Sequence, residues 1–509
     1  MSEVSQVNKR IAKNTIFLYI RLLLLMGVSF YTSRVVLQIL GVEDLGIYNV
    51  VGGIVTMMSF MNSSLNITTQ RFLNYEMGKG NSENLNRIFS MSFWCYSIIS
   101  FIVVLIAETI GLWFFYEYLN IPTDRLNVAF WVYQFSIFTF VVNLLTVPYT
   151  STIIANERMS VYAYVSIGDA ILKLLMLYIL NYMDYDKLGL YAFMMFIVTA
   201  FIGFCNWFFC RINFKESNLK FLWDKGLFYK LLSFSGWNTC GSLACSLSDQ
   251  GVNILINMFF GPIYNGSRAI SFQVRTAVNS FSANFLTAVR PQIFKSYAEG
   301  NLNYMNNLVY TSSKISVFLL LCLITPILLN TEYVLFLWLG EIPDKLVLFT
   351  QLVIIGIPIN TLFPTLAYVS QASGKVRDYQ LVASVTFVMV LISTFIVFKM
   401  KFNVYWAFIM SIIWDLIGLI LRLYILKIMM SFSIHDYTKK VIVPILKVLF
   451  ISVIPIAFLM SILNLQKNNF SYMCISSICV LTCMILTIWY FGLNSKEKQI
   501  IGSFINKFL

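Results

Sequence analysis

Charged side chains are scarce in this sequence. Only 12% of its 509 residues are Asp, Glu, Lys or Arg, whereas soluble proteins carry about 25%. A single histidine, His435, excludes a histidine-based catalytic triad and a cluster of histidine metal ligands. None of the nine cysteines has a partner at CxxC spacing, so neither a metal site nor a redox motif is indicated.

A nucleotide-binding loop is also missing. The sequence GKGN at residues 78–81 lacks the spacing of a P-loop and its following Ser or Thr. We therefore expect no cofactor and no ATP hydrolysis, and we classify the chain as a non-enzyme. Any uphill work would be coupled to a cation such as H⁺ or Na⁺, or to the membrane potential.

Long apolar runs fill the rest of the chain. The composition is 59% hydrophobic, and the runs are continuous over helical lengths instead of alternating as β-barrel strands do. The pattern predicts an all-α polytopic membrane protein with about fourteen transmembrane helices. Their centres are expected near Met26, Ile54, Ile102, Phe138, Leu172, Phe196, Cys245, Asn279, Leu320, Ile355, Val388, Ile412, Ser452 and Leu481.

One stretch occurs twice. Residues 40–87 and 260–307 align without a gap at an offset of 220 (261 − 41 = 220), which matches Gly41 with Gly261 and Gly80 with Gly300. Repeated halves are a common plan of membrane transporters. We expect two repeated six-helix lobes around a central cavity, residues 1–215 and 216–432. Residues 433–509 would form two appended helices and a cytoplasmic tail.

Basic residues are distributed unevenly among the loops. Counting alternate loops from the N-terminus, 22 of the 36 Lys and Arg residues lie on one side and 6 on the other. The positive-inside rule predicts that both termini are cytoplasmic. Because the basic residues are dispersed and form no arm or tail, nucleic acid is not an expected partner.

Polar side chains follow one face of several predicted spans. A polar stripe inside a membrane faces protein or water, so these residues are candidates to line a cavity. Interhelical hydrogen bonding is the alternative. The candidates are Ser59, Asn62, Asn66, Asn238, Ser242, Asn253, Ser271 and Asn279.

A few charges lie at membrane depth. Arg268 and Arg275 are seven residues apart and share one helix face, and Arg21 is the deep arginine of the first span. Arginine forks match phosphate oxygens, so these three are candidates for an anion site.

Asp249 has no basic residue one turn away on its own helix. It is the candidate for coupling or gating, unless it pairs with an arginine of a neighbouring helix such as Arg275. Asp169 with Lys173, and Asp415 with Arg422, are interpreted as structural pairs.

Two prolines occupy related positions near the ends of the fourth and tenth spans. Pro148 and Pro364 are 216 residues apart (364 − 148 = 216), close to the offset of the repeat. Each removes a helix hydrogen bond and permits a bend. Bends at matched positions suit halves that rock, and static kinks are the alternative.

The strings QGVNILINMFFGPIYNGSRAISFQV (250–274) and LGVEDLGIYNVVGG (40–53) resemble the polysaccharide-exporter branch of the multidrug/oligosaccharidyl-lipid/polysaccharide exporter superfamily. That branch contains the Wzx-type flippases of O-antigen and capsule. The resemblance implies a multi-pass protein of the bacterial inner membrane that works by alternating access.

The implied cargo is an undecaprenyl-pyrophosphate-linked oligosaccharide, such as an O-antigen, capsule or exopolysaccharide repeat unit, moved from the cytoplasmic to the periplasmic leaflet. Membrane lipid, the glycan polymerase and the chain-length machinery are the further candidate partners.

Two other functions are consistent with parts of the sequence. A cation-coupled multidrug exporter of the same fold would bind cationic amphiphiles and need acids in its cavity, but the first span contains two arginines and no acid. A membrane glycan polymerase or ligase would need a large periplasmic loop with catalytic residues, and the outer loops are short.

The charge distribution predicts the location of the C-terminus. A reporter that is active only in the periplasm should be inactive when it is fused after Leu509 and active when it is inserted between the first two spans. Periplasmic activity of the C-terminal fusion would contradict the predicted topology.

Overall fold

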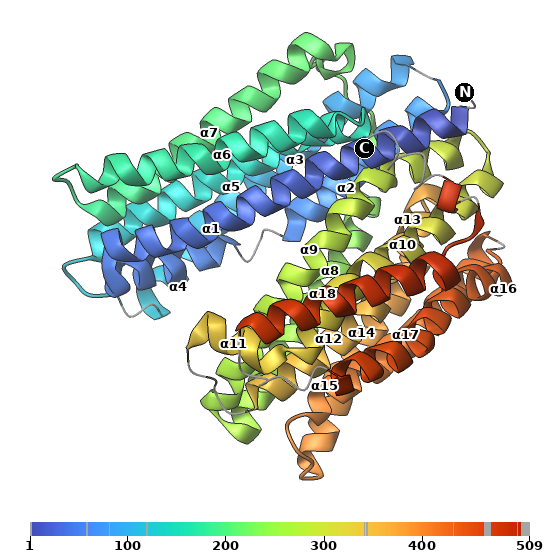
Figure 1. Cartoon of the computed structure of the whole chain (residues 1–509). Helices are drawn as coiled ribbons and strands as arrows, with labels where there is room; N and C mark the ends of the chain where they lie inside the picture. Colours follow the sequence, from blue (N-terminus) through green and yellow to red (C-terminus); the bar gives the residue numbers. More distant parts are fainter. Residues whose placement is uncertain are drawn as a thin grey trace. The chain divides into compact units, whose positions relative to one another are not determined.

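The computed structural model describes residues 3–56, 60–80, 82–118, 121–340, 342, 345–430, 432–462, 470–495 and 497–499. Within these ranges the chain is helical and contains no β-strand (Figure 1). The helices of residues 3–213 are α1 (Glu3–Thr56), α2 (Phe60–Gly78), α3 (Ser82–Ile106), α4 (Leu112–Tyr118), α5 (Leu126–Ala155), α6 (Met159–Asn181) and α7 (Lys187–Asn213).

The remaining helices lie between residues 225 and 487. They are α8 (Lys225–Phe260), α9 (Pro262–Ala298), α10 (Leu302–Leu329), α11 (Thr331–Leu339), α12 (Leu346–Asn360), α13 (Phe363–Ser373), α14 (Arg377–Lys399), α15 (Trp406–Met430), α16 (Ile434–Tyr437), α17 (Val443–Ile462) and α18 (Phe470–Thr487). Short π-helices occupy Ala107–Gly111, Thr438–Ile442 and Ile488–Gly492, and a 3₁₀ turn occupies Lys215–Ser217.

Ten helical stretches of the described residues are long and apolar enough to cross a membrane. Each contains one of the predicted centres, from Ile102 in residues 84–117 to Leu481 in residues 470–492. The prediction of an all-α polytopic membrane protein is confirmed. The other four predicted centres lie on α1, α8 and α9, and the polar residues Asn62 and Asn66 of the second predicted span lie on α2.

The two copies of the repeat have the same backbone. Gly41 has φ 77° and ψ 178°, and Gly261 has φ 90° and ψ 179°. Only glycine adopts this region readily. It lets the chain leave one helix and begin the next within a single residue, so no polar loop is needed. Gly80 and Gly300 also match, with φ of 71° and 78°.

Helix boundaries repeat at the same offset. α9 runs from 262 to 298, and α2 ends at 78, which is 298 − 220. α10 begins at 302 and α3 at 82, again 220 apart. Both prolines lie at the expected places, but in different settings. Pro148 is inside the continuous α5, whereas Pro364 lies in the first turn of α13 after α12 has ended.

The chain divides into two compact units. The first is Lys13–Thr239, and the second is Cys240–Leu509 together with Met1–Ala12. The first core is built around Tyr133, Phe115 and Ile137, and one core cluster of the second around Phe349, Phe408 and Ile256. α18 packs against α10 and α17 within the second unit (Figure 1). The predicted lobes 1–215 and 216–432 stay a prediction.

The segment between α7 and α8 is bound to α3. The Asn86 side chain donates to the carbonyls of Glu216 (3.0 Å) and Asn218 (2.5 Å), and Trp94 Nε1 donates to the Lys220 carbonyl (3.2 Å). These bonds attach residues 216–220 to the first unit.

Asp224 then caps α8, because its carboxylate accepts from the Gly226 and Leu227 N–H groups at 2.8 and 3.2 Å. The Leu227 hydrogen bond and the Arg87 guanidinium lower the pKa of Asp224.

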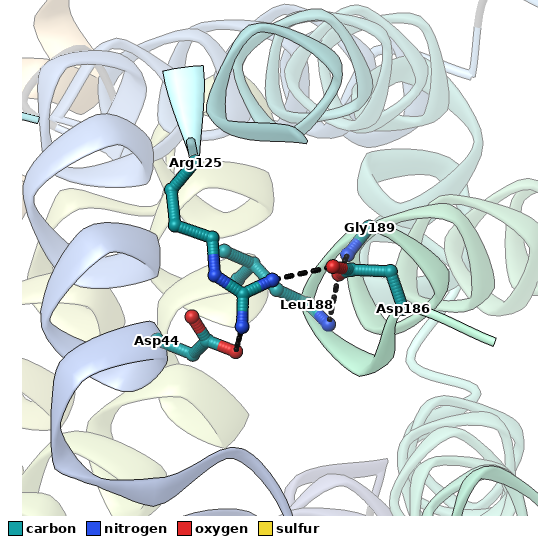
Figure 2. A network of polar contacts seen from close by, with 5 residues as sticks. All are labelled: Asp44, Arg125, Asp186, Leu188 and Gly189. Carbon is teal, nitrogen blue, oxygen red and sulfur yellow. Dashed lines mark hydrogen bonds and ion pairs between the residues drawn. The ribbon is translucent and has the colours of Figure 1, made fainter. Parts of the chain in front are cut away.

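Three segments of the first unit meet in an ionic network (Figure 2). Arg125, immediately before α5, lies 3.2 Å from Asp44 of α1 and 2.5 Å from Asp186. Asp186 also caps α7 by accepting from the N–H groups of Leu188 (3.1 Å) and Gly189 (3.2 Å). One guanidinium therefore fixes the stretch of α1 after Gly41 to the starts of α5 and α7.

The glycine geometry generates a stability prediction. Gly261→Ala should lower the free energy of unfolding by about 1–3 kcal/mol, because an alanine must adopt φ 90° or the junction must rearrange. Gly266→Ala, five residues later inside α9 with open space around its Cα, is the matched control and should be neutral or slightly stabilising. Thermal unfolding of the purified variants tests this, and equal melting temperatures would contradict it.

Candidate functional site

A cluster of charges lies inside the second unit. α8 contributes Asp249, α9 contributes Arg268 and Arg275, and α15 contributes Asp415 and Arg422. Asp415 lies within electrostatic range of Arg275, Arg422 and Asp249. The cluster thus holds three arginines and two aspartates.

Arg268 is bound by α8. Its guanidinium lies 4.0 Å from the Asp249 carboxylate, donates to the Asp249 carbonyl (3.2 Å) and donates to Asn253 Oδ1 (3.2 Å). It also stacks on the Phe272 ring at 4.0 Å. The side chain is 8% exposed. Its contacts are those of a residue that joins α8 to α9.

Asp249 therefore pairs with an arginine, but the partner is Arg268 and not Arg275. The i, i+4 spacing rule applies within one helix and could not identify this contact. The contact joins two consecutive helices, α8 and α9, across the Gly261 junction. The Asp249 side chain remains 48% exposed, so one face of its carboxylate is open to a cation or a proton.

Arg275 has a different environment. Its guanidinium lies 5.2 Å from the Phe272 ring, and its side chain is half-buried. Among the residues that the structure describes, it forms no hydrogen bond and no ion pair. Of the two arginines on this face of α9, only Arg275 has a guanidinium without a hydrogen-bond partner among the described residues, and Asp415 is the acid within its electrostatic range.

Asp415 was interpreted from the sequence as a partner of Arg422. In the structure its carboxylate accepts a hydrogen bond from Asn360 Nδ2 at 2.8 Å. Arg422 is buried and stacks on Phe363 at 3.9 Å.

Some residues of the polar stripes form hydrogen bonds between helices. Asn66 of α2 donates to Thr150 Oγ1 of α5 (3.2 Å), Ser271 of α9 shares a hydrogen bond with Thr350 of α12 (3.2 Å), and Asn253 of α8 accepts from Arg268 of α9. These three contacts support the interhelical alternative for their positions. Asn238 instead donates to the Phe234 carbonyl within α8 (2.9 Å).

Four predicted site residues remain. Asn62, Ser242 and Asn279 are each half-buried, and Ser59 lies outside the described residues. Their predicted roles stay predictions.

Arg21 belongs to the first unit. Its Nη2 is 3.5 Å from the Tyr162 hydroxyl, and its guanidinium stacks 4.6 Å from that ring. Arg268 and Arg275 belong to the second unit. The predicted three-arginine anion site therefore stays a prediction.

Solved structures of similar architecture are transporters. A MOP superfamily transporter from Pyrococcus furiosus, described with a binding pocket of reverse polarity, superposes with a TM-score of 0.71 and 11% identity over 85% of this chain and 98% of its own. A mutant of the MATE transporter VcmN from Vibrio cholerae gives 0.69 and 15% identity over 86% and 100%.

An outward-facing multidrug resistance MATE family transporter of the MOP superfamily gives 0.70 and 12% identity over 85% and 98%. This chain has the MATE fold. No protein-family model matches the sequence, and no curated protein matches it either. At these identities the likeness concerns the MATE fold alone, which supports a multi-pass membrane protein.

The contacts of Arg268 predict a structural role. Arg268→Ala should lower the free energy of unfolding by about 1–3 kcal/mol, because it leaves the Asn253 side-chain oxygen and the Asp249 backbone carbonyl without their donor. Arg275→Ala removes no hydrogen bond and should change stability by less than about 0.5 kcal/mol. Thermal unfolding of both variants in detergent tests the difference. A larger loss at Arg275 would refute the assignment.

Proposed function

We propose that this protein is a transporter of an anionic lipid-linked oligosaccharide, with Arg275 as a ligand of the substrate's pyrophosphate. The observation that carries this proposal is the half-buried guanidinium of Arg275, which has no internal hydrogen-bond partner among the described residues. A charged group at membrane depth is expensive unless it serves a purpose.

Charge balance supports an anionic cargo. The cluster contains three arginines and two aspartates, and residues 14–40 contain two arginines but no acid. A pyrophosphate group would replace the water around Arg275 with charge-assisted, bidentate hydrogen bonds. Arg268 supports the site indirectly, since it neutralises Asp249 and keeps that carboxylate away from the anion.

A cation-coupled drug exporter of the same fold is the second candidate. The half-exposed carboxylate of Asp249 favours it, as does the similarity to a multidrug resistance MATE family transporter. In the first proposal the same carboxylate is the coupling or gating residue. Proton or cation binding there would break its contact with Arg268 and loosen the join between α8 and α9.

Gene deletion with complementation separates the two candidates. Deletion should cause a lipid-linked glycan to accumulate in the cytoplasmic leaflet without changing drug susceptibility. Arg275→Ala should fail to restore export, and Arg275→Lys should restore part of it, because lysine offers charge without a bidentate fork. Both variants should reach wild-type levels in the membrane.

The contrary outcomes are specific. Full export by Arg275→Ala would remove the anion site. Drug hypersensitivity of the deletion strain, without glycan accumulation, would establish the drug exporter instead. Asp249→Asn should impair transport at normal protein level, and transport that is normal at every pH and sodium concentration would end the coupling role.

A further inference from the structure

The helix formed by α3 and α4 contains a π-helical turn at Ala107–Gly111. The Leu112 N–H bonds to the carbonyl of Ala107, five residues earlier, and the Tyr133 hydroxyl of α5 donates to the same carbonyl at 2.8 Å. The carbonyl thus uses both lone pairs, and Tyr133 has its hydroxyl satisfied although it is fully buried. π-turns of this kind are often found at functional positions.

Gly111 makes the approach of Tyr133 possible. A Cβ at this position would lie 2.1 Å from the Tyr133 hydroxyl oxygen, so any side chain would displace the tyrosine. The Tyr133 ring also packs against Phe115 at 5.6 Å between centroids. Three residues from two helices therefore hold one another in place.

An apolar pocket of about 210 Å³ lies beside this arrangement. Ile106, Ile110 and Phe114 form one side, and Tyr133, Ile137 and Phe140 of α5 form the other. No lining residue is charged, and the polar atoms of Tyr133 and Ala107 satisfy each other. The pocket therefore offers nothing to a phosphate or a sugar and fits a hydrocarbon chain.

The pocket lies at membrane depth. Residues 84–117 and Leu126–Ala155 are both membrane-crossing helices. Tyr133 and Phe140 are 7 and 14 residues from the start of α5, roughly 10 and 21 Å along it at 1.5 Å per residue, within a hydrocarbon layer of about 30 Å. Ile106 (39% exposed), Ile110 (62%) and Trp113 (57%) border the pocket on the exposed surface of the unit.

We propose that this pocket binds one acyl chain of a bilayer phospholipid. Surrounding lipid is the only abundant material at this depth, and an apolar pocket that opens to it gains dispersion contacts when a chain fills it. The site lies within the first unit.

Photolabelling in proteoliposomes tests this proposal. The probe is a phosphatidylcholine with a diazirine on one acyl chain, and adducts are mapped by mass spectrometry. The peptides that contain residues 103–114 and 133–140 should be labelled more strongly than the exposed surface of α17 around Phe450, which is 72% exposed.

Ile106→Trp, which fills the mouth of the pocket, should reduce labelling of the 133–140 peptide several-fold. Ile102→Trp is the matched control, one turn earlier, 48% exposed and outside the lining, and should leave labelling unchanged. If Ile106→Trp does not fold, Ile110→Trp with Leu105→Trp as its control replaces the pair.

Three outcomes would overturn the proposal. They are equal labelling of the pocket and the α17 surface, unchanged labelling in the filled variant, and displacement of the probe by undecaprenyl phosphate but not by unlabelled phosphatidylcholine. The last would assign the pocket to an isoprenoid chain. Displacement of the probe by unlabelled phosphatidylcholine, with no displacement by undecaprenyl phosphate, would support the proposal.

Discussion

Gly41 and Gly261 hold the chain in a backbone conformation that a side chain strongly disfavours. In a membrane protein this geometry has a particular value, since backbone groups outside helices lack partners in lipid. One residue suffices to end a helix and start the next, and few backbone groups are left without a helical bond. With this junction at the same place in both halves, the helix boundaries that follow it and the pair Gly80 and Gly300 also match.

Charge at membrane depth is the second constraint. Within the described residues, charged side chains at depth are frequently compensated nearby. Lys173 and Asp169 pair on α6 at 2.7 Å, and Lys314 of α10 pairs with Glu497 at 2.7 Å, with side chains only 5% and 7% exposed. Removing one partner of a buried ion pair strongly destabilises the fold, because the other charge is left buried and uncompensated. Within the second unit, the Lys314–Glu497 pair therefore joins the segment that follows α18 to α10.

The two halves share a fold and differ in chemistry. Positions of the first half that match Arg268 and Arg275 are Tyr48 and Val55. In the first unit the α3–α5 region forms an apolar pocket, whereas the second unit places a cluster of charges among α8, α9, α12 and α15. A repeated scaffold can thus carry two kinds of site, because the side chains at its matched positions are free to diverge while the glycines are not.

The sequence by itself determined the class of fold. Apolar runs of membrane-spanning length, the offset of 220 and the polar faces of the spans predicted an all-helical protein with duplicated halves, because each of these features is local or periodic. It also identified Asp249 and the arginines as unusual, since charge at membrane depth is visible without coordinates.

The tertiary structure decided the partners. Asp249 pairs with Arg268 across the Gly261 junction, Asp415 accepts from Asn360 of another helix, and Asn66, Ser271 and Asn253 bond to neighbouring helices. The pocket beside Tyr133 depends on a π-turn and on the absence of a side chain at Gly111. These features depend on how separate helices face one another, and helical periodicity gives the direction of a side chain around its own axis but not the helix that it meets.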